Sequence, residues 1–511
     1  MNVFRTLLLA SAAMVVAAPA FAQKSADTLR IGINNTLSSL SQYHSSQDEA
    51  STFYKRIYQS LIAYNEYEKK FVPLLATSWT RVSPTVLEFE LRQDTQFHNG
   101  NKFDADDVVA TWNYLLDPNV PLRFKNRYNW VKSVEKLGPY KVRLTAKAPN
   151  AIDMGLITYR FTVQDAETMA GLQDQADYGR LTPYGTGQYK VTQLDKNKGL
   201  IVERYENFKG DPKVSRAPIK RIHGVFQPDR QTQIAQLLTG GLDLIGNVNP
   251  DQANELAMNP QIEVTKTLSG DVIYFALDAS GQSGNKALTD PRVRRAIFMA
   301  INREAIVKNI VPGGETVKTL DVPCFESTIG CAYTKKAPAY DPEGAKKLLA
   351  EAGYPNGIDL AFDIYAPIKD IAIAMSGDLM KAGIRTAVQP VTMEIYRKKQ
   401  GDMRLQAWGQ FFPLGSHPDA ASIFTLLIEG KRGEYFNNDP IVLKAVRDAL
   451  VETDIAKREA IYQVAFDRMT DMSYVLPISA LPGVYVHTKD VKVLNSQLST
   501  SNQYIEDFAF K

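Results

Sequence analysis

Histidine and cysteine often perform catalysis or bind metal, and this chain of 511 residues contains only five and two of them, respectively. None of the histidines belongs to an H-E-x-x-H zinc pattern. The sequence also lacks G-x-S-x-G, G-x-x-x-x-G-K-[ST] and G-x-G-x-x-G patterns. We therefore predict no catalytic residues, no cofactor and no resident metal. An enzyme whose Ser or carboxylate residues meet from distant parts of the chain stays the alternative of another class.

The stretch AWGQFFPLGSHPDA, residues 407–420, combines ring side chains with residues that interrupt regular structure. It holds one Trp, two Phe, two Gly and two Pro. A core strand does not tolerate so much Gly and Pro, and a plain surface loop does not need so many rings. His417 in this loop, and His44 in SLSQYHSS, are the two histidines that we consider for ligand contact. The other three are interpreted as structural.

The N-terminus has the three parts of a secretory signal peptide. Arg5 is basic, residues 7–18 are almost all apolar, and Ala20-Phe21-Ala22 is a small-x-small cleavage site. We expect cleavage of residues 1–22, a mature chain that begins at Gln23, and export to the periplasm without a lipid anchor, because no Cys follows the cleavage site. A buried N-terminal helix is the alternative.

The charge balance bears on possible binding partners, and the two cysteines bear on covalent cross-linking. The chain has 59 Lys plus Arg against 56 Asp plus Glu and no basic block, so nucleic acid is an unexpected partner. In an exported protein the two cysteines of CFESTIGC, Cys324 and Cys331, are expected to form a disulfide worth roughly 2–3 kcal/mol. A metal site is the weaker reading, because no His lies near and zinc sites usually have four ligands.

The elements that position these residues alternate between strand and helix patterns. VLEFELRQDTQF alternates apolar and polar residues, as a half-buried strand does, and a helix follows with Asp104 as its N-cap. In the second half, three helices begin with an Asp-Pro pair, at Asp290, Asp341 and Asp439. Strands such as IDLAFDIYA and RTAVQPV lie between them. This alternation predicts an α/β fold, and a chain this long exceeds the roughly 250–300 residues of one core.

Two extended segments, 262–278 and 473–488, are candidates to cross between two lobes. If both cross, lobe one spans 23–269, lobe two spans 270–482, and 483–511 returns to lobe one.

Three segments together resemble one family. They are FHNGNKFDADDVVATWNYLLD, PYGTGQYKV, and DPRVRRAIFMAINREAIV followed by YDPEGAKKLLAEAGYPNG. In this order they resemble the extracytoplasmic solute-binding proteins of ABC importers, of the peptide/opine/nickel type (family 5). The resemblance implies a two-lobe periplasmic-binding-protein fold (type II, large cluster C form) with an extra subdomain on lobe one, at about 50–185. It also implies a monomer that closes over a small-molecule solute and meets an ABC permease of the inner membrane transiently.

The resemblance implies pocket residues as well. A Trp-Gly pair at the end of a lobe-two strand leads into the pocket loop in this family, and RLQAWGQFFPLGSHPDA matches it. The implied ligand contacts come from both lobes and from the outgoing crossing strand: Tyr43, His44, Tyr274, Trp408, Gly409, Phe411, Phe412, His417 and Asp419. Core packing of lobe two is the alternative role for the three rings of the loop.

One position departs from the pattern of the peptide-binding members, and this departure bears on the identity of the solute. Peptide-binding members place an Asp three residues after the Trp, where it holds the α-amine of the peptide, and here that position is Phe411. A peptide or an opine-like amino-acid derivative is the first expectation. A sugar or other neutral solute and a metal chelate such as nickel are the alternatives. We expect free-amine peptides to bind weakly unless Asp419 replaces the missing acid, and we expect Trp408→Ala to abolish binding.

Overall fold

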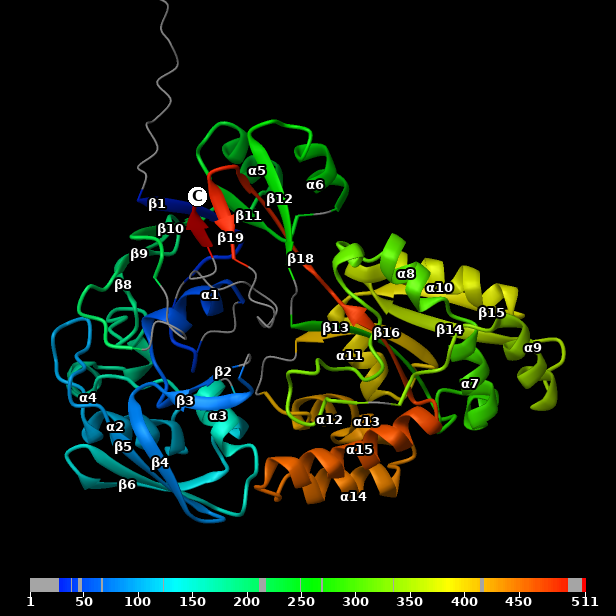
Figure 1. Cartoon of the computed structure of the whole chain (residues 1–511), viewed down its shortest axis with the longest axis horizontal. Coiled ribbons are helices and arrows are strands. Elements are labelled where there is room, and N and C mark those ends of the chain that lie inside the picture. The colour runs from blue at the N-terminus through cyan, green and yellow to red at the C-terminus, as the bar shows by residue number, and fades with distance from the viewer. Residues whose placement is uncertain are drawn as a thin grey trace, which may run out of the picture.

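The structure is a computed structural model. It describes residues 27–37, 39–44, 48–65, 68–122, 124–210, 217–248, 250–267, 270–333, 335–413, 418–494 and 508–511. The predicted signal peptide and Gln23 lie outside these ranges. Two large parts of the chain, each built around its own sheet, stand side by side and join near the middle of the molecule (Figure 1). We call them lobe one and lobe two.

Lobe one contains a seven-stranded mixed sheet. Its central strand β1 lies parallel to both of its neighbours, β10 and β11. The strand order is β12 (Ile262–Thr267), β18 (Gly483–Thr488), β11 (Leu244–Gly246), β1 (Thr28–Ile33), β10 (Arg221–Phe226), β9 (Gly199–Arg204) and β8 (Tyr189–Asp195). The helices in this part of the chain are α1 (Asp48–Ile57), α5 (Arg230–Leu238) and α6 (Pro250–Leu256). Near the C-terminus, β19 (Val491–Val493) pairs with β20 (Phe508–Phe510).

The chain between β1 and β8 builds an additional layer at the lower end of lobe one (Figure 1). Its four-stranded antiparallel sheet has the order β4 (Ala76–Ser83), β5 (Val86–Leu91), β7 (Lys141–Ala146) and β6 (Val131–Gly138). A separate hairpin pairs β2 (Ile62–Asn65) with β3 (Lys70–Pro73). The helices of this layer are α2 (Ala105–Leu116), α3 (Asp153–Arg160) and α4 (Ala166–Gly171).

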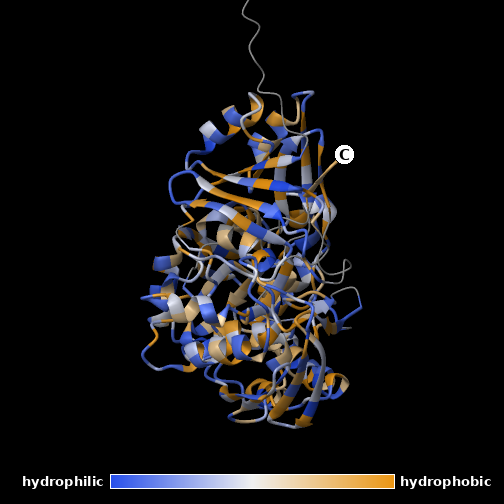
Figure 2. Ribbon diagram, turned by 90° about the vertical axis from the view of Figure 1, so that its left-hand side faces the viewer, coloured by the Kyte–Doolittle hydropathy of each residue, from blue (hydrophilic) through white to orange (hydrophobic). Residues whose placement is uncertain are grey.

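Lobe two contains a five-stranded sheet. The strand order is β15 (Ile384–Val391), β14 (Ile358–Tyr365), β16 (Ala407–Pro413), β13 (Asp271–Leu277) and β17 (Val475–Ala480). One hydrophobic core includes residues of α7 (Pro291–Met299), α8 (Arg303–Asn309), α9 (Pro342–Glu351) and α10 (Lys369–Lys381). A second core includes residues of α11 (Met393–Gly401), α12 (Ala421–Ile428), α14 (Pro440–Ala449) and α15 (Ile455–Asp471), near the short α13 (Lys431–Glu434). The sheet is therefore buried on both faces. Figure 2, which is viewed from the side of lobe one, shows hydrophobic and hydrophilic residues mixed along the elements of that lobe.

The chain changes sheets at two neighbouring places. β12 belongs to the sheet of lobe one and β13 to that of lobe two, and β17 and β18 repeat this change in the reverse direction. Each of the two extended segments is thus made of two strands that belong to different sheets. The predicted helix starts are confirmed, because Asp104, Asp290, Asp341 and Asp439 each accept a backbone N–H as an N-cap.

His98, in the segment FHNGNKFDADDVVATWNYLLD, is hydrogen-bonded to the segment PYGTGQYKV. The backbone N–H of Gly185 donates to Nδ1 of His98 at 3.3 Å, and Nε2 lies 2.9 Å from the carbonyl oxygen of Gly187. An N–H can only donate and a carbonyl can only accept, so the imidazole is neutral with its proton on Nε2. A Cβ on Gly185 would lie 1.9 Å from the carbonyl oxygen of Ile57, which explains the glycine. Both motifs therefore build the fold of lobe one.

This neutral histidine makes stability depend on pH. Burial lowers the pKa of His98 to about 4, below the roughly 6.5 of an unfolded chain. Between these two pKa values the unfolded state binds the proton more readily than the folded state. The contribution of His98 to the free energy of unfolding is therefore complete above pH 6.5 and is lost as the pH falls, by roughly 3 kcal/mol near pH 4. The variant His98→Asn does not titrate there. The stability advantage of the wild type over this variant is expected to shrink between pH 7 and pH 4 in denaturant titrations, and a constant difference would contradict the assignment.

Candidate functional site

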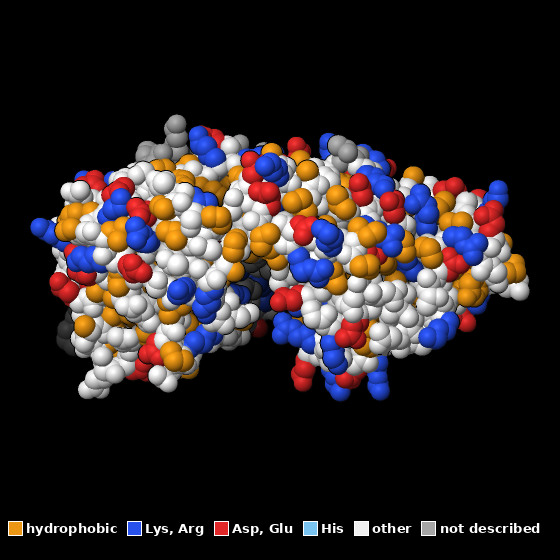
Figure 3. Space-filling view, turned by 90° about the horizontal axis from the view of Figure 1, so that it is seen from below, with side chains coloured by type: hydrophobic (Ala, Val, Ile, Leu, Met, Phe, Trp, Pro, Cys, Tyr) orange, Lys and Arg blue, Asp and Glu red, His pale blue; other side chains and the backbone are white. Residues whose placement is uncertain are grey.

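One edge of the lobe-two sheet lies next to the crossing segments. β13 begins at Asp271, directly after the first crossing, and Asp271 pairs with Pro413 at the end of β16. β14 runs parallel to β16, so its last residue, Tyr365, reaches the same edge. Figure 1 shows this edge turned toward lobe one, and the space-filling view from below shows a hollow between the lobes (Figure 3). Ligand sites favour such boundaries between domains and the carboxyl ends of parallel strands.

Successive side chains of β16 point to opposite faces of the sheet. Trp408 and Phe412 point into the core that includes α12 and α14, and only 3% and 4% of their surfaces are exposed. The Trp408 ring lies 4.8 Å from that of Tyr435, and Phe412 meets Tyr274 edge-on at 5.2 Å between centroids. These rings therefore support β16 from the interior of lobe two, on the face opposite to Phe411.

Phe411 points to the other face and keeps exposed surface. It is half-buried, and its ring centroid lies 5.4 Å from that of Tyr365, which is half-buried as well. Gly409 lies two residues before Phe411 on the same face, and a Cβ there would lie 2.3 Å from Cδ1 of Ile364 on the neighbouring strand, so a larger residue would require that side chain to move. Phe411 and Tyr365 thus form a pair of partly accessible rings at this edge. Tyr365 was not among the predicted residues, although it lies at the end of the predicted strand IDLAFDIYA, where ligand sites of α/β folds often occur.

Tyr274 and Gln410 form a polar pair on the opposite face of the sheet, the face of Trp408 and Phe412. The Tyr274 hydroxyl donates to Oε1 of Gln410 at 3.1 Å. Burial raises the pKa of Tyr274 to about 12, so the phenol stays neutral. Gln410 is half-buried and was also missed, because glutamine carries no motif of its own.

The two ligand contacts predicted for lobe one, Tyr43 and His44, are bonded to other residues of that lobe. Tyr43 is buried, and its hydroxyl donates to the carbonyl oxygen of Thr162 at 2.5 Å, while burial raises its pKa to about 12. His44 is half-buried, and its Nε2 lies 2.7 Å from the Tyr114 hydroxyl. Burial lowers the pKa of His44, so a neutral imidazole is favoured. Tyr43 is thus a core residue of lobe one, whereas His44 keeps some exposed surface.

Asp419 faces the interior of lobe two. One carboxylate oxygen accepts from Nε of Arg458 at 2.9 Å, and the other accepts from the Tyr462 hydroxyl at 2.7 Å and from the Ala421 N–H at 3.0 Å. Both side chains of the ion pair are 4% exposed. Burial raises the pKa of Asp419, and Arg458 opposes this shift. The carboxylate is therefore engaged within the lobe, while His417 lies outside the described residues.

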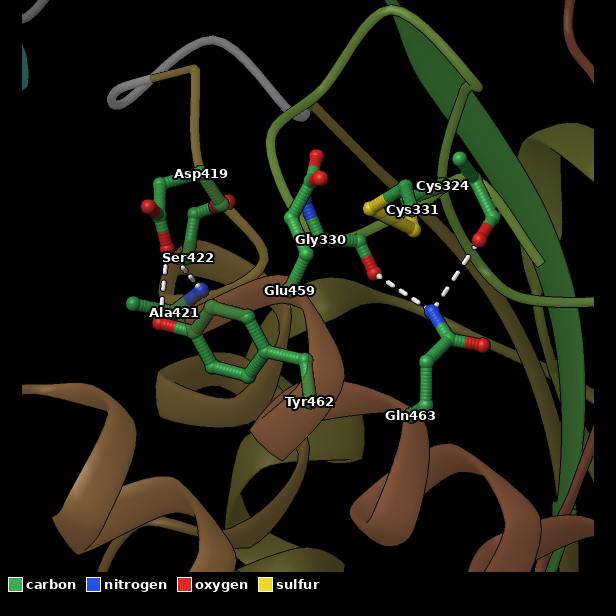
Figure 4. The surroundings of a disulfide bond; sticks show 10 residues. Cys324, Gly330, Cys331, Asp419, Ala421, Ser422, Glu459, Tyr462 and Gln463 are labelled. Carbon is green, nitrogen blue, oxygen red and sulfur yellow. Dashed lines mark hydrogen bonds between the residues drawn. A yellow bond between two sulfur atoms is a disulfide. The ribbon is translucent and has the colours of Figure 1, made fainter. Parts of the chain in front are cut away.

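The disulfide fixes the segment that carries Asp419. The structure joins Cys324 to Cys331, as predicted, with 6.0 Å between their Cα atoms. Within this small loop, the Ile329 N–H donates to Pro418 and the Ile329 carbonyl accepts from Ala420. Figure 4 shows Gln463 of α15 donating to the carbonyl oxygen of Gly330 beside the disulfide. The disulfide loop is thus bonded on one side to Pro418 and Ala420 and on the other to α15.

No helix among the described residues is long and apolar enough to span a bilayer. Within the same ranges, no cluster of three or more His, Cys, Asp or Glu side chains has the arrangement of a metal site.

Residues 70–421 match the model of the bacterial extracellular solute-binding proteins, family 5. Heme-binding protein A of Haemophilus influenzae is 29% identical over 394 residues, which cover 70% of this chain and 69% of that protein. Glutathione-binding protein GsiB of Escherichia coli K12 is 28% identical over 350 residues, 68% of this chain and 65% of that protein. This last match thus spans slightly less than two thirds of the relative's length.

Solved structures share the fold along almost the whole chain. NikA from Brucella suis, in complex with Fe(III)-EDTA, superimposes with a TM-score of 0.80 at 22% identity, covering 95% of this chain and all of NikA. The periplasmic murein tripeptide-binding protein MppA, in an unliganded open form, gives a TM-score of 0.77 at 18% identity, covering 95% and 97% of the two chains. The predicted two-lobe α/β fold is confirmed.

Proposed function

Because the chain belongs to the bacterial extracellular solute-binding proteins of family 5, we propose that it captures a small solute between its lobes and delivers it to an ABC permease. The observation that carries the proposal is the pair of neighbouring crossings, β12 to β13 and β17 to β18, beside the hollow between the lobes. Paired crossing strands let two rigid bodies rotate about one place. A solute that touches both bodies stabilises their closed arrangement.

The moving bodies of this proposal follow the crossings. Residues 270–482 move as one body against 23–269 together with 483–511, and the extra subdomain at about 50–185 moves with lobe one. The mature chain acts as a periplasmic monomer after loss of residues 1–22. It works without catalysis, and a periplasmic enzyme or chaperone on the same fold is the competing proposal. A permease gene and an ATPase gene next to the gene for this protein would favour transport.

For the solute we propose a peptide or an opine-like amino-acid derivative. The glutathione-binding relative and the tripeptide-binding structural neighbour support this class. The heme-binding relative favours one further candidate, a flat tetrapyrrole that the half-buried rings of Phe411 and Tyr365 would contact. A sugar and a metal chelate remain the other candidates.

A thermal-shift screen of the mature protein tests the function. Peptides, glutathione, opines, sugars, heme and nickel chelates are the probes. A true solute at a hundred times its Kd is expected to stabilise the folded protein by about 2.7 kcal/mol. Turnover of a probe, without stabilisation by any of them, would favour the enzyme instead.

Free-amine peptides are expected to bind weakly, with Kd values above micromolar. A buried ammonium needs a carboxylate partner, and the site offers Phe411 where an acid would serve, while Asp419 is engaged by Arg458. Calorimetry of a dipeptide and its N-acetylated form measures this directly, since only the ammonium differs. We expect the acetylated form to bind at least as tightly. A nanomolar Kd for the free-amine form alone would contradict the assignment and return Asp419 to the site.

A further inference from the structure

Contacts outside the crossing segments also join the two lobes. The backbone N–H of Ala151, in lobe one, donates to the carbonyl oxygen of Leu450, in lobe two, at 2.8 Å. The next side chain, Ile152, packs against the hydrophobic core of lobe two. Elsewhere the Tyr64 hydroxyl lies 3.4 Å from the carbonyl oxygen of Ser327 in the disulfide loop. Figure 1 places α3, which follows Ile152, and α14 below the crossing strands, so the first contact joins the lobes at a place away from the crossings.

Lobe one builds the turn that presents Ile152 by itself. The Asn150 side chain accepts the N–H of Ile152 at 3.2 Å, which fixes the turn locally. Asp153 follows at the start of α3, and its carboxylate accepts from Arg81 of β4 at 2.7 Å. Only 3% of the Asp153 side chain is exposed. These bonds lie within lobe one, so the turn keeps its shape when the lobes separate.

In lobe two, the C-terminal end of α14 provides the hydrogen-bond acceptor for this turn. Leu450 caps the C-terminus of α14, and the last carbonyls of a helix have no partner within the helix. The Ala151 N–H satisfies one of them. Leu450 also packs, half-buried, against the same core that receives Ile152. The contact thus combines one directional hydrogen bond with an apolar side chain, and both are available only when the lobes are close.

We propose that the turn Asn150–Asp153 is a latch that stabilises the closed arrangement of the lobes without touching the solute. The inference rests on the proposed closing of the lobes and extends it. The apparent Kd equals the intrinsic Kd divided by the fraction of protein that is competent to close over the solute. The latch therefore sets affinity from a distance, and Ile152 is a positioning residue for binding.

The test removes the apolar half of the latch. Ile152→Ser in the mature protein is expected to increase the radius of gyration of the solute-free protein in small-angle X-ray scattering. It is also expected to weaken the Kd for the tightest probe of the screen about tenfold, chiefly through faster release. The matched control is Ile441→Ser, the same change in the first turn of α14, where the side chain is 45% exposed. This control is expected to match the wild type in both measurements.

An unchanged radius of gyration and Kd in Ile152→Ser would overturn the latch and leave the proposed function intact. Because the solute-free radius needs no solute, the latch and the solute assignment fail in different experiments. Circular dichroism establishes that each variant is folded. If Ile152→Ser does not fold, Ile152→Val removes one methylene and is expected to shift both quantities in the same direction by a smaller amount. Wild-type values for that variant would overturn the latch equally.

Discussion

Asp419→Ala is expected to lower the free energy of unfolding by about 3–5 kcal/mol. The substitution leaves the Arg458 guanidinium buried without its carboxylate, and it removes the acceptor of the Tyr462 hydroxyl at 2.7 Å. A buried charge that loses its partner retains its full desolvation cost. Chemical denaturation of the solute-free protein measures the loss. The effect belongs to lobe two as a structure and does not depend on which solute the protein binds.

Two controls separate this burial effect from a simple loss of an ion pair. Asp359 and Arg385 form an ion pair at 2.6 Å in the same lobe, but their side chains are 82% and 54% exposed, so Asp359→Ala is expected to cost less than about 1 kcal/mol. The double variant Asp419→Leu/Arg458→Met removes both buried charges and is expected to regain most of the lost stability. An Asp419→Ala protein of wild-type stability that no longer binds any probe would show instead that Asp419 holds the solute.

Trp408→Ala is expected to abolish solute binding and to lower the free energy of unfolding by about 3–5 kcal/mol. The side chain is 3% exposed and packs on Tyr435, so its loss leaves a cavity directly behind the strand that carries Phe411. Calorimetry with the tightest probe, at a temperature where the variant is folded, measures the binding. The expectation from the sequence is kept, but its cause changes from lost stacking on the solute to loss of the support behind the wall.

Two further variants test that cause. Phe411→Ala, at the half-buried ring itself, is expected to weaken binding with a smaller loss of stability than Trp408→Ala. Trp79→Ala alters a half-buried tryptophan of β4, in lobe one, and is expected to leave the Kd unchanged. A Trp408→Ala protein that binds the probe with wild-type affinity would contradict the role of this ring.

Local signals were sufficient to predict the helix starts and the disulfide. An Asp followed by Pro satisfies free N–H groups within one turn, so Asp290, Asp341 and Asp439 cap their helices whatever surrounds them. The two cysteines lie seven residues apart in a chain that the sequence predicts to be exported, which leaves a short loop for one bond to close. These expectations needed no knowledge of distant contacts.

The orientation of the site residues could not be predicted in the same way. Alternation along β16 predicts that Trp408 and Phe411 point apart, but the sheet is covered on both faces, so hydrophobicity does not tell which ring stays accessible. The partner of Asp419 is Arg458, 39 residues further along the chain in α15. Nothing in the sequence of α15 indicates that this helix contacts the loop of Asp419. The contact of Ala151 with Leu450 joins still more distant parts of the chain.

Small-angle X-ray scattering of the mature protein, with and without the tightest probe, tests most directly whether the solute closes the two lobes on each other. The probe is added at a hundred times its Kd, so that nearly all of the protein is bound. Because the solute adds contacts that only the closed arrangement offers, the population shifts toward that arrangement. The predicted result is a smaller radius of gyration with the probe than without it. An unchanged radius with a tightly bound probe would contradict capture by closure.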